Sequence, residues 1–117
     1  MNTKPEKPVR AVQLCHELLR WVLPRLDHFP RSRRFTLGQR IETGLLDVLG
    51  SLINATYSKR KTHALAEANQ QLAVVRHLWR LCFELKVLDQ RRYLFGAELL
   101  VTLGKQIGGW QRHVQNA

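Results

Sequence analysis

The sequence predicts an all-α protein that folds as one antiparallel four-helix bundle with up-down-up-down topology. Apolar residues recur three and four positions apart along four helix-length segments, which is the spacing of one helix face. No segment alternates apolar and polar residues as a half-buried strand does, and no Asn-Gly or Asp-Gly pair indicates a hairpin. The breaks between the segments are short, so consecutive helices are expected to be antiparallel neighbours.

The first helix is expected at about residues 9–28, ahead of Pro30. Pro24 lies inside it and should kink or loosen the last turn, because proline lacks an N–H and crowds the carbonyl four residues earlier. The predicted buried face consists of Leu14, Leu18, Trp21, Val22 and Leu26.

The second helix is expected to start at Thr36. Thr36 and Gln39 form a Thr-x-x-Gln pattern, typical of a capping box in which both side chains satisfy backbone N–H groups. The helix should end at the polar segment 57–62. Its apolar stripe consists of Leu37, Ile41, Leu45, Val48, Leu49, Leu52 and Ile53.

The third helix, with Thr62 as its expected N-cap, carries two neighbouring apolar stripes and ends at residues 88–90. The first stripe consists of Leu65, Ala68, Leu72, Val75, Trp79 and Cys82. The second consists of Val74, Leu78, Leu81, Leu85 and Leu88. One stripe is enough for the core of a bundle, so we expect this helix to be buried also against a neighbouring subunit.

The fourth helix is expected to be capped by Asp89. Gly96 and Gly104 weaken a helix by about 1 kcal/mol each relative to alanine, which indicates that another helix backbone approaches closely there. The pair at residues 108–109 should loosen the C-terminal end. The predicted core face consists of Tyr93, Ala97, Leu100, Leu103, Ile107 and Trp110.

The chain of 117 residues suits a single domain, 1–117, with residues 1–8 as a flexible basic tail. It has no apolar run of about 18 residues, and no apolar segment follows the first basic residues as in a secretory signal. Cys15 and Cys82 are far apart in apolar helical surroundings, which favours reduced, buried thiols. We therefore expect a cytoplasmic protein without a membrane partner.

The charge of the chain is the first indication of function. Nineteen Lys and Arg against nine Asp and Glu give a net charge of +10 and an isoelectric point near 10.6. Such a field attracts polyanions and accelerates association with them. A merely solubilising charge and an anionic membrane surface are the alternatives.

Bundle topology divides the basic residues between two ends, because the first and third connections share one end. That end should collect Arg25, Arg31, Arg33, Arg34, Lys86, Arg91 and Arg92. The opposite end should collect Lys4, Lys7, Arg10, Lys59, Arg60, Lys61, Lys105 and Arg112. Both ends are predicted to be strongly basic, although any single lysine there can simply be solvated.

Arg76 and Arg80 differ from the other cations because they sit four residues apart among apolar residues of the third helix. A guanidinium in such surroundings usually has a carboxylate, phosphate or aromatic partner. An intramolecular pair with Glu42 or Asp47 and a contact with phosphate or a partner protein are both open.

Enzyme chemistry is not predicted. The five histidines show no metal-ligand spacing with cysteine or carboxylates, and the acidic residues form no acid/base pair. The chain has neither the Glu-x-x-His motif of di-iron bundles, nor a P-loop, nor a nucleophile elbow. We expect no catalytic residue, no metal and no cofactor.

Three segments, taken together, carry a family resemblance. Trp-Val-Leu-Pro at residues 21–24 leads into Phe-Pro-Arg-Ser-Arg-Arg-Phe-Thr-Leu-Gly at residues 29–38; Arg-Arg-Tyr opens the last helix at residues 91–93; and Gly-Lys-Gln-Ile-Gly-Gly-Trp follows at residues 104–110. This set resembles the Avd group, the accessory variability determinants of diversity-generating retroelements. The resemblance covers roughly residues 9–112 and extends to bacterial four-helix-bundle proteins encoded in intervening sequences of ribosomal RNA genes.

The resemblance implies a homopentameric barrel of four-helix bundles. Such a protein would bind the element's reverse transcriptase and structured RNA, including template-repeat RNA, in support of mutagenic reverse transcription. It places the functional third-helix arginines of the family at Arg76 and Arg80. Charge mapping adds, as further nucleic-acid or reverse-transcriptase contacts, Arg31, Arg33, Arg34, Lys59, Arg60, Lys61, Arg91, Arg92 and Lys105. The alternative is a protein–protein interaction module of the same fold with no direct nucleic-acid role.

Overall fold

The computed structural model describes residues 7–116, with side chains from residue 10 onward. Residues 1–6 of the predicted basic tail, Lys4 among them, lie outside the described residues. Residues 7 and 8, expected in the tail, instead belong to the first turn of a helix.

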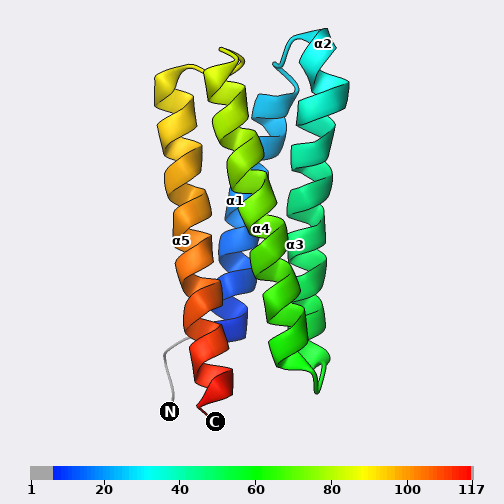
Figure 1. Ribbon diagram of the computed structural model, residues 1–117, viewed down its shortest axis with the longest axis vertical. Helices are drawn as coiled ribbons and strands as arrows, with labels where there is room; N and C mark the ends of the chain where they lie inside the picture. Colours follow the sequence, from blue (N-terminus) through cyan, green and yellow to red (C-terminus); the bar gives the residue numbers. More distant parts are fainter. Residues whose placement is uncertain (1–6, 117) are drawn as a thin grey trace.

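Four long helical segments build the molecule, and no strand occurs in residues 7–116. They are α1 (Lys7–Leu26), the continuous series α2 (Arg31–Arg33), π-helical turn η1 (Arg34–Gly38) and α3 (Gln39–Tyr57), then α4 (Lys61–Glu84) and α5 (Gln90–Gln115). Figure 1 shows the segments running alternately up and down the long axis. The predicted antiparallel four-helix bundle is confirmed.

The helices pack as a closed cycle of neighbours. α1 contacts α3 and α5, and α4 contacts α3 and α5 (Figure 1). The molecule measures 47 × 26 × 18 Å. Because α4 lies between α3 and α5, it has two flanks, one bordering each neighbour.

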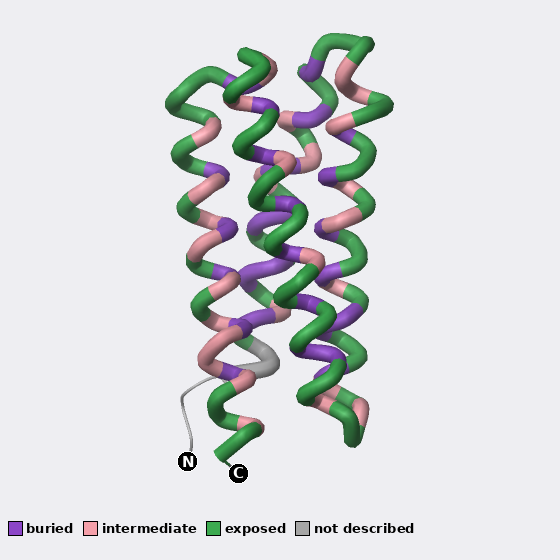
Figure 2. The backbone as a smooth tube through the Cα atoms, in the orientation of Figure 1, coloured by how far each residue is buried: buried purple, intermediate pink, exposed green. Residues whose placement is uncertain are grey.

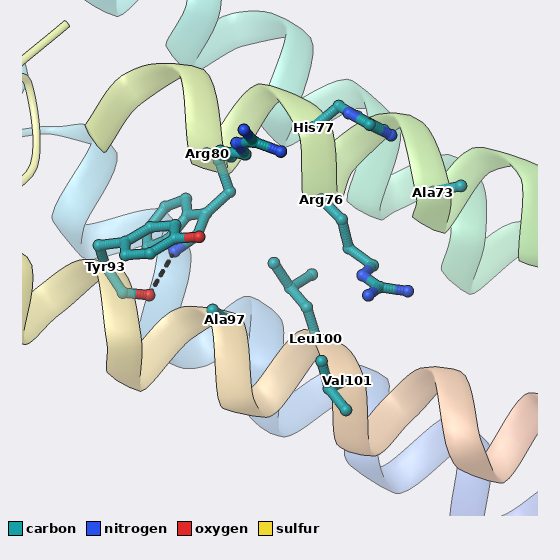
Figure 3. A pocket seen from close by; sticks show the side chains of 9 residues that line it. Ala73, Arg76, His77, Arg80, Tyr93, Ala97, Leu100 and Val101 are labelled. Atoms are coloured by element: carbon teal, nitrogen blue, oxygen red, sulfur yellow. Dashed lines mark hydrogen bonds between the residues drawn. The ribbon is translucent and has the colours of Figure 1, made fainter. Parts of the chain in front are cut away.

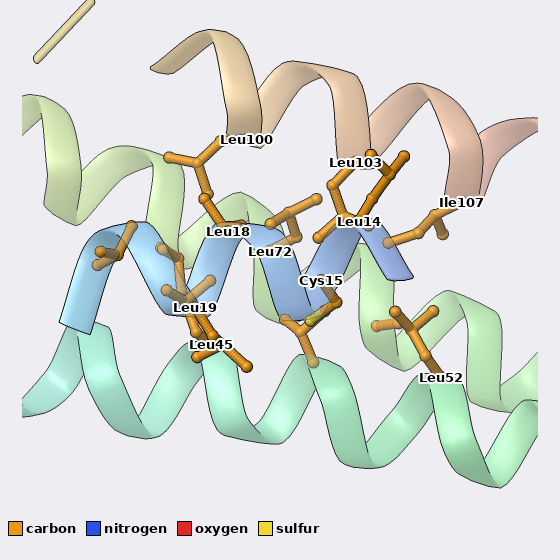
Figure 4. Packing of buried hydrophobic residues seen from close by; sticks show 14 of the residues in the cluster. Leu14, Cys15, Leu18, Leu19, Leu45, Leu52, Leu72, Leu100, Leu103 and Ile107 are labelled. Atoms are coloured by element: carbon orange, nitrogen blue, oxygen red, sulfur yellow. The ribbon is translucent and has the colours of Figure 1, made fainter. Parts of the chain in front are cut away.

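The core runs the length of the bundle and is built from the predicted stripes. Figure 2 shows buried residues facing inward on every long helix, and Figure 4 shows leucines of α1 meeting those of α3, α4 and α5. The first stripe of α4 is entirely buried, as predicted. Trp21 and Leu37 are only half-buried, and Ile53 is 43% exposed because it faces away from the bundle axis.

The start of the second helical segment corrects the capping-box prediction. The segment begins directly after Pro30, whose carbonyl accepts hydrogen bonds from the N–H groups of Arg33 (2.8 Å) and Arg34 (2.9 Å). Thr36 lies five residues after Arg31, the first residue of the segment, and its hydroxyl donates a hydrogen bond to the Ser32 carbonyl (3.2 Å). It therefore lies inside a helix, where a Ser or Thr hydroxyl commonly bonds to the preceding turn.

Of the two other predicted N-caps, Thr62 is wrong and Asp89 is confirmed. Thr62 does not cap α4, which already starts at Lys61; instead the Lys61 ammonium donates to the Ala55 and Thr56 carbonyls (2.8 and 3.1 Å) and closes the end of α3. Asp89 caps α5 as predicted, since its carboxylate accepts from the Arg92 N–H at 2.8 Å.

The end of α4 lies earlier than the sequence suggests. Lys86 adopts a left-handed backbone conformation (φ 63°). Its N–H bonds the Phe83 carbonyl (3.0 Å), and the Val87 N–H bonds the Cys82 carbonyl (2.8 Å). This is a Schellman motif, which usually has glycine in the left-handed position. Because a lysine occupies that position, the sequence pattern does not indicate that the helix ends here.

The prolines and glycines inside helices have unequal effects. α1 ends at Leu26, within a turn of Pro24, whereas α5 continues past residues 108–109 to Gln115, so the predicted loosening there is wrong. A Cβ on Gly96 would lie 2.4 Å from Cζ2 of Trp79, so the predicted close approach is made by a ring rather than a backbone. Gly104 would make only an ordinary contact.

Candidate nucleic-acid interface

A cation-lined groove runs between α4 and α5. It consists of two hollows of about 340 and 260 Å³ that share Arg76 and Val101. Arg80 from α4 and Tyr93 from α5 line the larger, upper hollow, and Figure 3 shows Arg76, also on α4, reaching toward α5. The other lining residues are Asn69, Ala73, His77, Trp79, Ala97, Leu100, Gly104, Lys105, Gly108 and Arg112.

Helical periodicity brings four permanent cations to this groove. Arg76 and Arg80 are about 6 Å apart along α4, and Lys105 and Arg112 are about 10 Å apart along α5, at a rise of 1.5 Å per residue. Small and apolar side chains form the floor, against which the aliphatic stems of the cations can pack while their charged groups face water.

The charge of the groove is largely unopposed. No Asp or Glu lines it within the described part of the chain. Arg80 forms an ion pair with Glu84 (3.4 Å), but both side chains are more than half exposed, and such pairs contribute little. The intramolecular alternative with Glu42 or Asp47 is wrong, because among the described residues neither carboxylate forms an ion pair with Arg76 or Arg80; Glu42 pairs instead with Arg34 at 3.1 Å.

A buried hydrogen bond fixes the width of the upper hollow. The Trp79 Nε1–H donates to the Tyr93 carbonyl at 2.9 Å (Figure 3). Trp79 is 1% exposed, so this bond joins α4 to α5 directly beneath the cations. The groove is therefore set by the packed core rather than by loops.

The first basic end is confirmed in part. Arg25, Arg91 and Arg92 line one hollow beside α1 and α5. Arg33 lies near the end of α4, where its charge partly offsets the burial that raises the pKa of Cys82 to about 11. Arg34 is engaged within the chain, because it pairs with both Asp27 (3.5 Å) and Glu42; Arg31 remains exposed.

The second basic end is smaller than the charge map suggests. Lys105 and Arg112 line the α4–α5 groove together with Arg76, so part of the predicted end belongs to a side face. The Lys61 ammonium donates two hydrogen bonds to carbonyls of α3. Lys59 and Arg60 are exposed in the connecting loop.

The aromatic residues of the predicted core stripes are Trp21, Trp79, Tyr93 and Trp110, whereas three other aromatic residues lie on the surface. Phe35, Tyr57 and Phe95 are 66%, 86% and 50% exposed. None of the three belongs to a predicted core stripe, and each has a Lys or Arg within four residues. An aromatic residue that lies outside the core stripes and close to a Lys or Arg is therefore the sequence pattern that indicates an exposed aromatic side chain here.

The opposite flank of α4 is apolar. Val74, Leu81 and Leu85 from the second predicted stripe are 46%, 37% and 45% exposed, whereas Leu88 is buried. A hollow of about 560 Å³ between η1, α3 and α4 has Val74 and Phe35 as its large apolar lining residues; the other lining residues are Thr36, Gln39, Arg40, Thr43, Gly44, Asp47 and Gln71. Leu78, from the same stripe, is partly buried against the core. Three of the five residues of the second stripe are thus exposed within the chain, and their burial by a neighbouring subunit stays a prediction.

Two further observations concern other classes of site. Among the described residues, no group of three or more His, Cys, Asp or Glu side chains is placed to hold a metal ion. No helix in residues 7–116 has the length and apolar character needed to cross a membrane.

Fold and groove define a basic four-helix-bundle protein with four cations along one side face. The model of the bAvd-like family matches residues 10–114, nearly the whole described chain, and the protein belongs to this family. Neither a curated protein nor a solved structure shows significant similarity to the chain.

Proposed function

We propose that the protein is a non-catalytic accessory factor of a diversity-generating retroelement. It binds structured RNA and the element's reverse transcriptase and thereby supports mutagenic reverse transcription. Membership of the bAvd-like family supports the retroelement context. The α4–α5 groove carries the RNA-binding part of the proposal, because four cations line it without a carboxylate.

Phosphate contacts would dominate binding in such a groove. Each neutralised phosphate releases condensed counterions, so affinity falls steeply with salt. The exposed candidates at the first end, Arg31, Arg91 and Arg92, extend the positive surface beyond the groove.

The same proposal includes assembly into a ring of five subunits. The apolar flank formed by Val74, Leu81 and Leu85 supports burial between subunits, since exposed apolar patches commonly mark protein interfaces. A ring would repeat the basic groove around its circumference and let one RNA engage several subunits, which raises avidity without new contacts.

The test is charge reversal in the groove, with a matched control. Arg76→Glu with Arg80→Glu lowers the net charge of the chain from +10 to +6. Arg10→Glu with Arg20→Glu makes the same change at exposed positions of α1. At low salt the groove variant should bind structured RNA about a hundredfold more weakly and lose about two units of salt slope, while the control loses only severalfold.

Other outcomes overturn the proposal or select the alternative. Absent binding at low salt, salt-insensitive binding, or equal loss in both variants contradicts an RNA groove. If the groove variant loses capture of the reverse transcriptase but keeps its RNA affinity, the protein is an interaction module and the groove a protein-docking site.

A further inference from the structure

We propose that a hollow between α1 and α5 binds an unpaired base of single-stranded nucleic acid. The hollow has a volume of about 370 Å³. Its lining residues are Trp21, Arg25, Asp89, Arg91, Arg92 and Phe95. The inference rests on the proposed function, to which it adds the structural class of the nucleic acid and a second, base-dependent contact outside the α4–α5 groove.

Two aromatic rings form the stacking surface of this hollow. The Phe95 ring lies 4.7 Å from the Trp21 ring, centroid to centroid, with 33° between the planes. Trp21 is supported from the core by Trp79, with 6.0 Å between the ring centroids and 65° between the planes. Phe95 keeps 50% of its surface exposed, so a rigid aromatic platform has an accessible side.

Guanidinium groups surround the rings. Arg25 lies over the Trp21 ring at 4.9 Å from its centroid, and planar guanidinium groups stack on bases as well as on aromatic side chains. Arg92 is held by Asp89 at 2.7 Å, and no described carboxylate forms an ion pair with Arg91. The lining therefore has three positive charges against one negative charge.

This combination favours a nucleotide in a single strand. Stacking on exposed aromatics requires an open base face, which a continuous duplex does not offer. Aromatic platforms beside cations that track the backbone are the common design of single-strand binding surfaces. An apolar protein segment fits less well, because it would have to cover three guanidinium groups, of which only Arg92 is paired with a carboxylate of the hollow.

The other exposed aromatics lack this arrangement. Phe35 has one neighbouring guanidinium, Arg34, at 5.7 Å, but Arg34 is already bound by two carboxylates. In the described residues Tyr57 has no aromatic neighbour in contact. Tyr93 stacks on Phe83 with 4.5 Å between the ring centroids and lines the α4–α5 groove beside Arg80, but both of these rings are partly buried. The hollow beside Phe95 differs from it in having a ring that is 50% exposed next to a ring covered by a guanidinium group.

The full-length chain provides its own probe for this site. Trp79 and Trp110 are 1% and 2% exposed, whereas Trp21 is half-buried and lines the hollow, so quenching of tryptophan fluorescence by a stacked base reports on Trp21. The ligands are an oligothymidylate about ten nucleotides long, within the site sizes of single-strand binders, and an abasic oligomer with the same number of phosphates. We expect the oligothymidylate to quench the fluorescence and to bind about tenfold more tightly than the abasic oligomer.

Variants of Phe95 separate stacking from packing. Phe95→Leu should abolish the preference for the oligothymidylate, and Phe95→Tyr should retain it, because only the second keeps an aromatic face. Leu94→Ala, at a neighbouring residue that is 53% exposed and does not line the hollow, should leave the preference unchanged. Circular dichroism and melting temperature verify that the variants are folded.

The outcomes distinguish this inference from the function on which it rests. Equal, salt-dependent binding of the oligothymidylate and the abasic oligonucleotide overturns the stacking site but does not contradict the RNA groove. Absence of binding to either oligomer and to structured RNA at low salt overturns both. A change of oligomer mass in Phe95→Leu identifies a second copy of the chain as the occupant and also overturns the inference.

Discussion

The two flanks of α4 differ in chemistry although they border the same buried stripe. The flank toward α5 carries Arg76 and Arg80 above an apolar floor. The other flank carries Val74, which lines a hollow with α3, and Leu81, seven residues later on the same side of the helix; both are more than one-third exposed, as is Leu85 directly after the end of α4. Salt should affect the two flanks differently, because it screens contacts to phosphate but leaves hydrophobic association intact. One helix can therefore serve two kinds of partner that are separable by ionic strength.

The largest expected effect comes from placing charge on the apolar flank. Val74→Glu with Leu81→Glu should convert the proposed ring into monomers, because a buried unpaired carboxylate is costly. The monomer should stay folded, since both positions are exposed within it. Sedimentation measures the mass. An unchanged mass would remove this flank from the interface, and Arg76→Glu with Arg80→Glu serves as the control that keeps the wild-type mass.

The next effect tests how closely α4 approaches its neighbour α5. Gly96→Ala places a Cβ 2.4 Å from the ring of Trp79. This ring cannot rotate away without breaking its hydrogen bond to the Tyr93 carbonyl. We expect a loss of about 1–3 kcal/mol in the free energy of unfolding. Gly104→Ala, on the same helix, meets only Leu72 at 3.6 Å and should gain up to about 1 kcal/mol. Urea unfolding of both variants measures the difference, and equal stabilities would contradict the close approach.

The smallest expected effect is the pH dependence of stability that comes from the thiols buried in the core, which changes little near neutral pH. Burial raises the pKa of Cys82 from 9.0 to about 11 and that of Cys15 to about 12. The folded state therefore holds these protons more tightly than the unfolded chain. Their contribution to stability is complete below pH 9 and is lost as pH rises toward 11 and 12. The stability difference between wild type and Cys82→Ala should be constant from pH 6 to 8 and shrink above pH 9; a constant difference up to pH 11 would show that Cys82 titrates normally.

Periodicity predicted the core well because burial of a helix face depends on spacing alone. The first stripe of α4 followed from it directly, and so did the inner face of α5 except at Tyr93 and Ala97, which are only partly buried. The helix ends did not, because they depend on backbone geometry: Lys86 adopts a left-handed conformation that sequence patterns associate with glycine, and the helix after Pro30 starts without a side-chain cap.

The candidate sites needed the third dimension for a different reason. Arg76 and Arg80 stood out in the sequence, but their neighbours Lys105 and Arg112 join them only through the antiparallel pairing of α4 and α5. The hollow beside Phe95 combines residues from α1 and α5 that are separated by most of the chain. Charge counting along the sequence could predict the amount of positive charge, and only packing determines where it is concentrated.

The π-helical turn at Arg34–Gly38 has a consequence for the phase of the helix. A π turn holds one residue more than an α turn, and each residue of an α-helix rotates the chain by about 100°. The extra residue is thus absorbed within the turn itself, because five residues of π-helix rotate the chain by nearly the same angle as four residues of α-helix. Deleting one residue from this turn would restore regular α-helix, while the preceding arginines keep nearly their direction and α3 keeps its register in the core.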